Sequence, residues 1–334
     1  MSFLLQYAVF LAKLFTLVIS ILIVTAGIFS ITRKAKEQNK NKLSIKKLNK
    51  KYQEFAETLN AEILNKNQFR KYIKEEKIKL KKNSKLLKKR VFVLNFQGDI
   101  KATAVNNLRE EITALIQVAT PQDEIVLRLE SGGGMIAPYG LAASQLQRLK
   151  DKRIPLTVTI DKIAASGGYL MACVGDKILA APFSIIGSIG VVAQLPNFHR
   201  FLKKRDIDFE LLTAGEYKRT LTIFGENTNK AREKTQHDLE EIHHLFKDFI
   251  KTNRKRVDLA EVATGAHWLA KDALKLNLVD ELITSDDYLS LLAGSGKVEI
   301  YECRYIIKKS VSEKLYGNLQ SILSQLTWFK ASSS

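Results

Sequence analysis

A serine followed by two glycines is the cluster in this chain that is best suited to chemistry. Ser166, Gly167 and Gly168 follow a short apolar stretch at residues 163–165 and lead into a helical pattern that extends to about Val174. At a strand-to-helix junction the serine hydroxyl is exposed, and the N–H behind it lies at a helix N-terminus, where an oxyanion is stabilised. A hydroxyl that only caps the helix suits the same position, so the residues alone leave both interpretations open.

A second candidate element is the glycine turn at residues 132–134, which follows a strand-like run at residues 123–129. Three consecutive glycines permit positive φ and close backbone approach, so their N–H groups can point at an anion. A plain tight turn has the same composition. The turn is not a phosphate-binding Walker loop, because no Gly-Lys-Ser/Thr follows it, and it lacks the spaced glycines of a dinucleotide fingerprint.

The base that would activate Ser166 is less evident. Three of the five histidines lie on the predicted long polar helix at residues 230–256, where a solvated surface is expected: His237, His243 and His244. Glu240 and His243 have the spacing of metal ligands, but no His-Glu-x-x-His motif accompanies them, and we expect no metal site. Lysine can act as a base where burial lowers its pKa, and Lys218 follows a predicted strand. An ordinary surface lysine is the simpler interpretation from the residues alone.

Strand-like and helical stretches alternate from Arg90 onward, which predicts an α/β fold with parallel strand pairing. The expected strands lie at residues 91–96, 123–129, 156–160, 177–180 and 208–212. The expected helices lie at residues 106–117, 137–149, 166–174 and 230–256. The charge-free run at 178–197 holds two prolines and two glycines, and it is interpreted as buried strand and turn.

The composition is that of a folded chain with one strongly basic segment. Of 334 residues, 46% are hydrophobic and 26% charged, and the five prolines and two cysteines exclude collagen-like, low-complexity and disulfide-scaffold classes. The net charge is +18, but residues 33–90 alone hold 21 basic and six acidic side chains. Apolar residues recur there at helical intervals, which predicts one or two amphipathic helices. Anionic lipid is the expected partner, with oligomer packing as an alternative; no nucleic-acid motif is present, and we expect no nucleic-acid partner.

An apolar run precedes the basic segment. Residues 14–31 are eighteen uncharged residues, close to the length of about 20 that a membrane-spanning helix needs. A charged region before the run is nearly absent, which favours a retained anchor over a cleaved signal peptide. Nine basic residues at 33–51 face Lys13 alone on the other side, so the positive-inside rule places the remaining chain in the cytoplasm. The predicted divisions are an anchor at 1–32, a basic region at 33–90, a catalytic domain at 91–300 and an extension at 301–334.

The region from Ala165 to Val192 is similar to the core motif of the S49 serine peptidases, the family of signal peptide peptidase A. The matching blocks are Ser166-Gly167-Gly168-Tyr169, Gly187-Ser188-Ile189-Gly190-Val191, Gly215-Glu216-Tyr217-Lys218, Ala263-Thr264-Gly265 and Leu278-Val279-Asp280. The chain departs from the family at residues 130–134, where Glu-Ser-Gly-Gly-Gly replaces Asn-Ser-Pro-Gly-Gly. Which glycine of this turn supplies an oxyanion N–H is therefore open by one position.

The resemblance implies a membrane-anchored serine endopeptidase of a bacterial inner membrane, with a ClpP/crotonase-like α/β spiral and no metal or other cofactor. Ser166 would be the nucleophile and Lys218 its base, while Ser188 would orient the lysine or serve only as a turn hydroxyl. The backbone N–H groups of Gly133 and Gly167 would hold the oxyanion. Residual signal peptides or damaged membrane proteins are the expected substrates. Relatives form ring-like homo-oligomers, and in those of this length the serine and lysine come from neighbouring protomers.

Two other functions compete with this one. A crotonase-like acyl-CoA enzyme would use the glycine-turn N–H groups to hold an enolate, and it would need neither Ser166 nor Lys218. A catalytically silent membrane scaffold would use its basic helices to recruit lipid or partner proteins. The presence of both residues argues against a silent scaffold.

Overall fold

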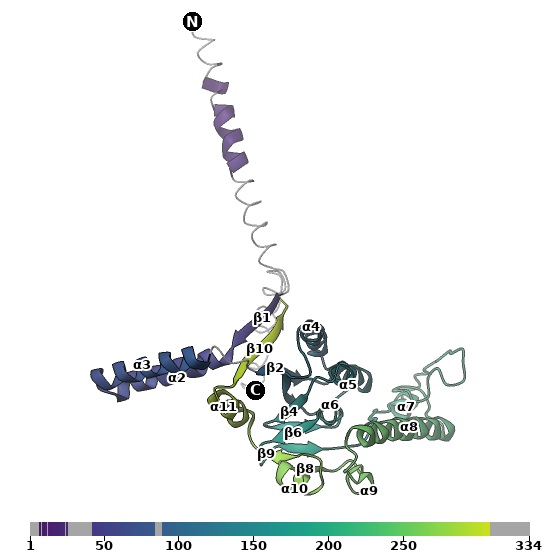
Figure 1. Cartoon of the computed structure of the whole chain (residues 1–334). Coiled ribbons are helices and arrows are strands. Elements are labelled where there is room, and N and C mark those ends of the chain that lie inside the picture. The colour runs from purple at the N-terminus through teal and green to yellow at the C-terminus, as the bar shows by residue number, and fades with distance from the viewer. Residues whose placement is uncertain are drawn as a thin grey trace, which may run out of the picture. The chain divides into compact units, whose positions relative to one another are not determined.

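The computed structural model describes residues 7, 9–11, 13–23, 25, 42–83 and 89–307 (Figure 1). It divides into one unit formed by Met1–Ser44 and Tyr305–Ser334 and a larger one, Ile45–Arg304, which carries the candidate site. Within the described ranges, no helix has both the length and the apolar character that crossing a bilayer requires. The predicted anchor at 14–31 is described only in part, because residues 24 and 26–31 lie outside these ranges, so it stays a prediction.

Ten strands of the described chain form one mixed sheet. Its main path has the order β1-β10-β2-β3-β4-β6-β9. These strands are β1 Lys42–Lys47, β10 Val298–Ile306, β2 Lys89–Gly98, β3 Glu124–Ser131, β4 Leu156–Ile160, β6 Lys177–Ala180 and β9 Glu281–Leu282. A side branch contains β5 Ile163–Ala165, β7 Ile185–Gly187 and β8 His267–Leu269. The pairs from β10 to β9 and from β3 through β5 to β7 are parallel, and β7 pairs with β8 antiparallel, so the predicted α/β class with a largely parallel sheet is confirmed.

Strand β2 explains why the sheet is buried on both sides. Successive side chains of a strand point to opposite faces. Val91 and Val93 accordingly join the core on one face, while Phe92, Leu94 and Phe96 join the larger core on the other. A strand with two apolar faces is typical of parallel sheets that are covered by helices on both sides.

Helices provide this cover. The helices of the described chain are α2 Leu48–Ile63, α3 Lys66–Asn83, α4 Val105–Ile116, α5 Ile136–Asp151, α6 Gly167–Ala172, α7 His199–Lys203, α8 Asn229–Asn253, α9 Leu259–Val262, α10 Ala270–Lys275 and α11 Ser285–Gly294. On the larger core, α5 packs between α4 and α6 (Figure 1). The other core is closed by α11 and by Leu48 at the start of α2. One or two helices were expected in the basic region, and the structure has two, α2 and α3, which lie side by side.

The strand predictions were correct for two buried strands and wrong for one exposed stretch. Strands β4 and β6 have the predicted bounds, 156–160 and 177–180. The strand expected at residues 208–212 is wrong, because this stretch is irregular and exposed in the described chain. Its alternating apolar side chains, such as Phe209 and Leu211, resemble a strand, but none of the described strands pairs with it to supply the hydrogen bonds that define one.

Candidate active site

The predicted site is assembled where the sheet forks. Strand β3 pairs with β4 through residues 125–128, but its last residue, Ser131, pairs with Ala164 of β5. Strand β5 in turn pairs with β7, with Ala165 opposite Gly187. The carboxyl ends of β3, β5 and β7 therefore lie side by side. Because parallel strands end at the same edge, the glycine turn, Ser166 and Ser188 meet there, as ligand-binding residues do in many α/β sheets.

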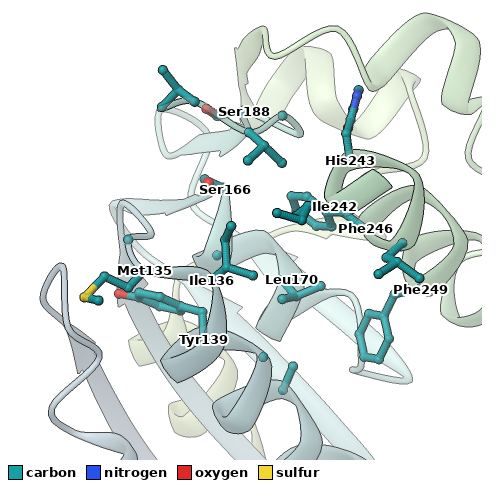
Figure 2. Close-up of a pocket in the computed structure, with 18 of the residues that line it drawn as sticks. Met135, Ile136, Tyr139, Ser166, Leu170, Ser188, Ile242, His243, Phe246 and Phe249 are labelled. Carbon is teal, nitrogen blue, oxygen red and sulfur yellow. The ribbon is translucent and has the colours of Figure 1, made fainter. Parts of the chain in front are cut away.

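Ser166 has a strained backbone and a hydroxyl that no described residue contacts through a hydrogen bond. Its φ of 53° and ψ of −120° lie in a region that residues with a side chain rarely adopt. The position is held because its N–H donates to the Gly187 carbonyl at 2.8 Å and its carbonyl accepts from the Leu170 N–H at 2.9 Å. Ser166 precedes α6, yet its side chain does not cap the helix, so the helix-cap interpretation is wrong. No described residue forms a hydrogen bond with its Oγ, which faces the pocket (Figure 2).

Gly167 follows the serine directly and Gly133 lies beside it, and neither position has room for a side chain. A Cβ built on Gly167 would lie 2.5 Å from Cγ of the Tyr139 ring. A Cβ on Gly133, whose φ is +86°, would lie 2.7 Å from the Gly167 nitrogen and 2.8 Å from Cβ of Ser166. The structure thus brings together both residues that were expected to form an oxyanion hole. The Gly133 N–H already donates to Ser131 Oγ at 3.1 Å, so an oxyanion would have to share or replace that acceptor.

Ser188 occupies the equivalent place on the neighbouring strand. It follows β7 as Ser166 follows β5, has a φ of 52°, and lines the same pocket. Its N–H donates to the Ala266 carbonyl at 2.6 Å, which ties it to the chain that leads into β8. The preceding Gly187 has no room for a side chain, because its Cβ would lie 2.7 Å from the Trp268 ring. Whether Ser188 orients a lysine stays a prediction.

Lys218 is not brought to this site within one chain. It lies in the irregular segment between α7 and α8, its side chain is exposed, and it is absent from the residues that line the pocket around Ser166. Its N–H donates to the Gly215 carbonyl at 3.2 Å, and its amino group contacts no acceptor among the described residues. The described part of its own protomer does not provide the shielded environment that was expected around Lys218.

A largely apolar pocket of about 1030 Å³ opens beside Ser166 (Figure 2). Met135, Ile136 and Tyr139 at the start of α5 form one wall. Leu170 of α6 and an apolar stripe of α8 form the other; the stripe residues are Ile242, Leu245, Phe246 and Phe249. A site of this size and character can hold several residues of an apolar peptide.

His243 is a pocket residue that the sequence interpretation missed. It was expected on a solvated surface, but it is half-buried in the pocket wall, and its Nε2 is buried with no hydrogen-bond partner in the described chain. The helical spacing of Ile242, Phe246 and Phe249 marks the inward face of α8, and His243 borders that face. This periodicity was the available indication of its position.

The remaining titratable groups near the site have structural roles. Burial raises the pKa of the Cys173 thiol to about 12, so this cysteine at the C-terminal end of α6 is not a nucleophile. Asp280 of the C-terminal motif accepts hydrogen bonds from the Ile178 N–H at 2.7 Å and from Arg254 at 2.8 Å. Burial alone would raise the pKa of Asp280, but these hydrogen bonds outweigh it and lower the pKa. The pair joins the end of α8 to β6.

One group of exposed side chains on α8 could approach a metal ion. The ligand atoms of His237, Asp238 and Glu241 lie within 4.8 Å of one another. Exposed acidic groups often cluster without an ion, and this cluster contributes no residue to the pocket beside Ser166. We assign it no function.

Comparison with known proteins identifies the family. The profile of Peptidase family S49 N-terminal matches residues 2–146, and that of Peptidase family S49 matches residues 148–299. The chain belongs to peptidase family S49. It is 46% identical to the "Probable protease SohB" of Haemophilus influenzae over 92% of this chain and 90% of that relative. It is 45% identical to the "Probable protease SohB" of Buchnera aphidicola subsp. Schizaphis graminum over 99% of both chains.

Membership of family S49 confirms the resemblance and makes this chain a peptidase. The first profile contains the glycine turn, and the second contains Ser166, Ser188 and Lys218. The roles of these individual residues stay predictions.

Proposed function

We propose that the chain is a serine endopeptidase in which Ser166 is the nucleophile. The observation that carries this proposal is the hydroxyl of Ser166, which has no hydrogen-bond partner among the described residues. A strained backbone holds it at a strand-to-helix junction, where it faces an apolar pocket. In the proposed reaction Ser166 Oγ forms a bond to the peptide carbonyl carbon, its proton passes to a base, and the amine leaves with a proton. Water then hydrolyses the acyl-enzyme.

We propose that the base is Lys218 of a neighbouring protomer, oriented by Ser188. Because the lysine of the same chain is exposed and does not line the pocket, a complete dyad requires another source for it. The segment that carries Lys218 exposes large apolar side chains, including Leu212, which is 91% exposed. Contiguous apolar exposure of this kind fits an interface between subunits. A homo-oligomer would cover these side chains and shield the lysine from water, which lowers the pKa of an ammonium group.

The proposed substrates are peptides with apolar side chains. The apolar walls contributed by α5 and α8 favour such side chains, as found in residual signal peptides and in damaged membrane proteins. The proposal includes an anchor at residues 14–31 and a cytoplasmic peptidase domain, because basic residues are concentrated after the run. It also includes lipid contact by the basic region and a ClpP/crotonase-like arrangement of the sheet.

The test is covalent labelling of the full-length chain with a fluorophosphonate probe, followed by mass spectrometry of the labelled peptide. We expect the phosphonyl group on Ser166, loss of labelling in Ser166→Ala, and slower labelling at the same residue in Ser188→Ala. The Ser188 variant is the matched control, because both serines follow neighbouring strands and line one pocket. A label on Ser188, or labelling that survives in Ser166→Ala, would reject the proposed nucleophile.

A further inference from the structure

A buried chain of hydrogen bonds connects the glycine turn to the far end of β2. The Gly133 N–H contacts Ser131 Oγ at 3.1 Å, Ser131 Oγ contacts the Tyr139 hydroxyl at 2.6 Å, and that hydroxyl contacts the Asp99 carbonyl at 2.8 Å. Both hydroxyl-bearing side chains are buried, with Ser131 2% exposed and Tyr139 fully buried.

The direction of every hydrogen bond in this chain is fixed by its last acceptor. A backbone carbonyl can only accept, so Tyr139 donates its single proton to Asp99. The Tyr139 oxygen must then accept from Ser131, and Ser131 Oγ, having donated its own proton, accepts from Gly133. Bonds that all run in one direction polarise one another and strengthen the chain. The orientation of the Gly133 amide is therefore coupled to the tyrosine hydroxyl.

Tyr139 also contacts the other predicted oxyanion donor. Its ring occupies the space in which a side chain at Gly167 would lie, so Gly167 packs directly on it. The ring is held in turn by an edge-to-face contact with Phe96, with the ring centres 6.5 Å apart. Tyr139 lies on the wall of the pocket that Ser166 also lines (Figure 2). Its ring packs on Gly167, and its hydroxyl reaches the Gly133 N–H through Ser131.

A third glycine, Gly98, leaves room for the hydroxyls of Ser131 and Tyr139. Gly98 lies opposite Ser131 in the β2–β3 register. A Cβ at this position would lie 2.3 Å from the Tyr139 hydroxyl and 2.4 Å from Ser131 Oγ. Any larger residue at the end of β2 would displace the hydroxyl pair.

We propose that Ser131 and Tyr139 are positioning residues that aim the backbone N–H groups of Gly133 and Gly167 at the reaction oxyanion. The inference rests on the proposed function, since it assumes acyl transfer at Ser166. When the oxyanion forms, it takes the Gly133 proton in place of, or together with, Ser131 Oγ. The hydroxyl pair holds the amide in the required direction before substrate arrives, so little reorganisation is needed during the reaction.

The test compares Tyr139→Phe, Ser131→Ala and the double variant in the full-length chain. Tyr139→Phe keeps the ring on Gly167 and removes only the hydroxyl, so it tests the hydrogen bonds of Tyr139 separately from the packing of its ring. Loss of an oxyanion donor typically lowers kcat by about 10²–10³, and a misaimed donor should cost less, so we expect each single variant to lower kcat by about 10-fold. KM should be unchanged, and the double variant should resemble either single one, because the residues act as one chain.

A second readout separates positioning from a purely structural role. A peptide aldehyde forms a hemiacetal with Ser166, and the hemiacetal oxygen occupies the oxyanion position. Its Ki should rise by the factor by which kcat falls, while the Ki of an uncleavable peptide of the same sequence stays constant. Tyr288→Phe is the matched control: it removes a hydroxyl that donates to Glu124 at 2.6 Å, beside the core on the other face of the sheet. It should change thermal stability but neither Ki nor kcat.

The possible failures are distinguishable. If wild type cleaves peptides and Ser166→Ala does not, the proposed function stands; unchanged kcat and aldehyde Ki in Tyr139→Phe and Ser131→Ala would then overturn the positioning role. A faster Ser131→Ala enzyme would also overturn it, because Ser131 would then be withholding the Gly133 proton. If the fluorophosphonate does not react at Ser166 in wild type, the proposed function fails and this inference fails with it.

Discussion

Replacing Gly167 by alanine tests the geometry of the candidate oxyanion hole directly. The new Cβ would lie 2.5 Å from Cγ of the Tyr139 ring and 2.9 Å from its Cβ and Cδ1. Carbon atoms in favourable contact are about 3.5–4.0 Å apart, so the ring or the Gly167 backbone must move by about 1 Å. The backbone at Gly167 does not require glycine for its φ, so this contact is the reason for the expected effect.

The size of the effect follows from how firmly the ring is held. Tyr139 is fully buried and packs on Phe96. Its hydroxyl accepts a hydrogen bond from Ser131 and donates one to the Asp99 carbonyl. An extra methyl group in such a packed site typically costs about 1–3 kcal/mol of unfolding free energy. If the backbone moves instead, the N–H at Gly167 leaves its position by about 1 Å, and a displacement of that size can lower the rate by about 10²-fold. We therefore expect a large loss of kcat together with a modest loss of stability.

The assay is peptide cleavage and chemical denaturation of Gly167→Ala beside Gly294→Ala. Gly294 ends α11, and a Cβ there would meet no atom within 4 Å, so its variant controls for the substitution itself. The control should keep full activity and be at least as stable as wild type, since alanine is favoured over glycine in a helix by about 0.5–1 kcal/mol. A Gly167→Ala enzyme as active and as stable as Gly294→Ala would refute the packing argument.

Three further predictions concern the dyad and the acid stability of the sheet. Ser166→Ala and Lys218→Ala should each abolish peptide cleavage without unfolding the chain, which circular dichroism and cleavage assays check. Co-expressed and doubly purified, the two variants should regain part of the activity, because mixed assemblies pair an intact serine with an intact lysine; inactive assemblies that contain both chains would refute a shared site. Burial alone would raise the pKa of Asp123, but hydrogen bonds from Arg90 and Thr120 lower it to about 2. The pKa of Asp123 in the folded chain is thus below the unfolded value of about 3.9. Its ionised carboxylate therefore adds about 2 kcal/mol to the free energy of unfolding above pH 4, and this stabilisation is lost as pH falls toward 2. Denaturation of Asp123→Asn should show that deficit at pH 7 and a smaller one near pH 3.

The buried strands were predictable because their evidence is local. The stretches at 156–160 and 177–180 are short apolar runs between polar or turn residues, and both faces of β4 are buried. The place of Ser166 at a strand-to-helix junction was also predictable, since an apolar stretch, a serine and two glycines follow one another directly. Such features depend on neighbours in sequence.

The contacts that assemble the site were not predictable in this way. Nothing in residues 123–131 indicates that the sheet forks at Ser131, because the fork depends on which strand pairs with the end of β3. Lys218 lies 52 positions after Ser166, and no pattern in the residues between them fixes a distance. His243 was misplaced because residues on a helix with many charges look solvated until the packed face of that helix is known.

The glycines of the site are explained by the residues that occupy the space beside them. Gly98 leaves room for the hydroxyls of Ser131 and Tyr139, Gly167 for the tyrosine ring, and Gly133 for Cβ of Ser166. These glycines come from three distant stretches of sequence but share neighbours. Gly98 and Gly167 both make room for Tyr139, and Ser131, beside Gly98, accepts the hydrogen bond from Gly133. A larger side chain at one glycine therefore displaces Tyr139, Ser131 or Ser166, and with it the backbone N–H groups that the others present. Loss of activity on substitution at Gly98, which is remote from Ser166 in sequence, would follow from this coupling through the hydroxyl pair.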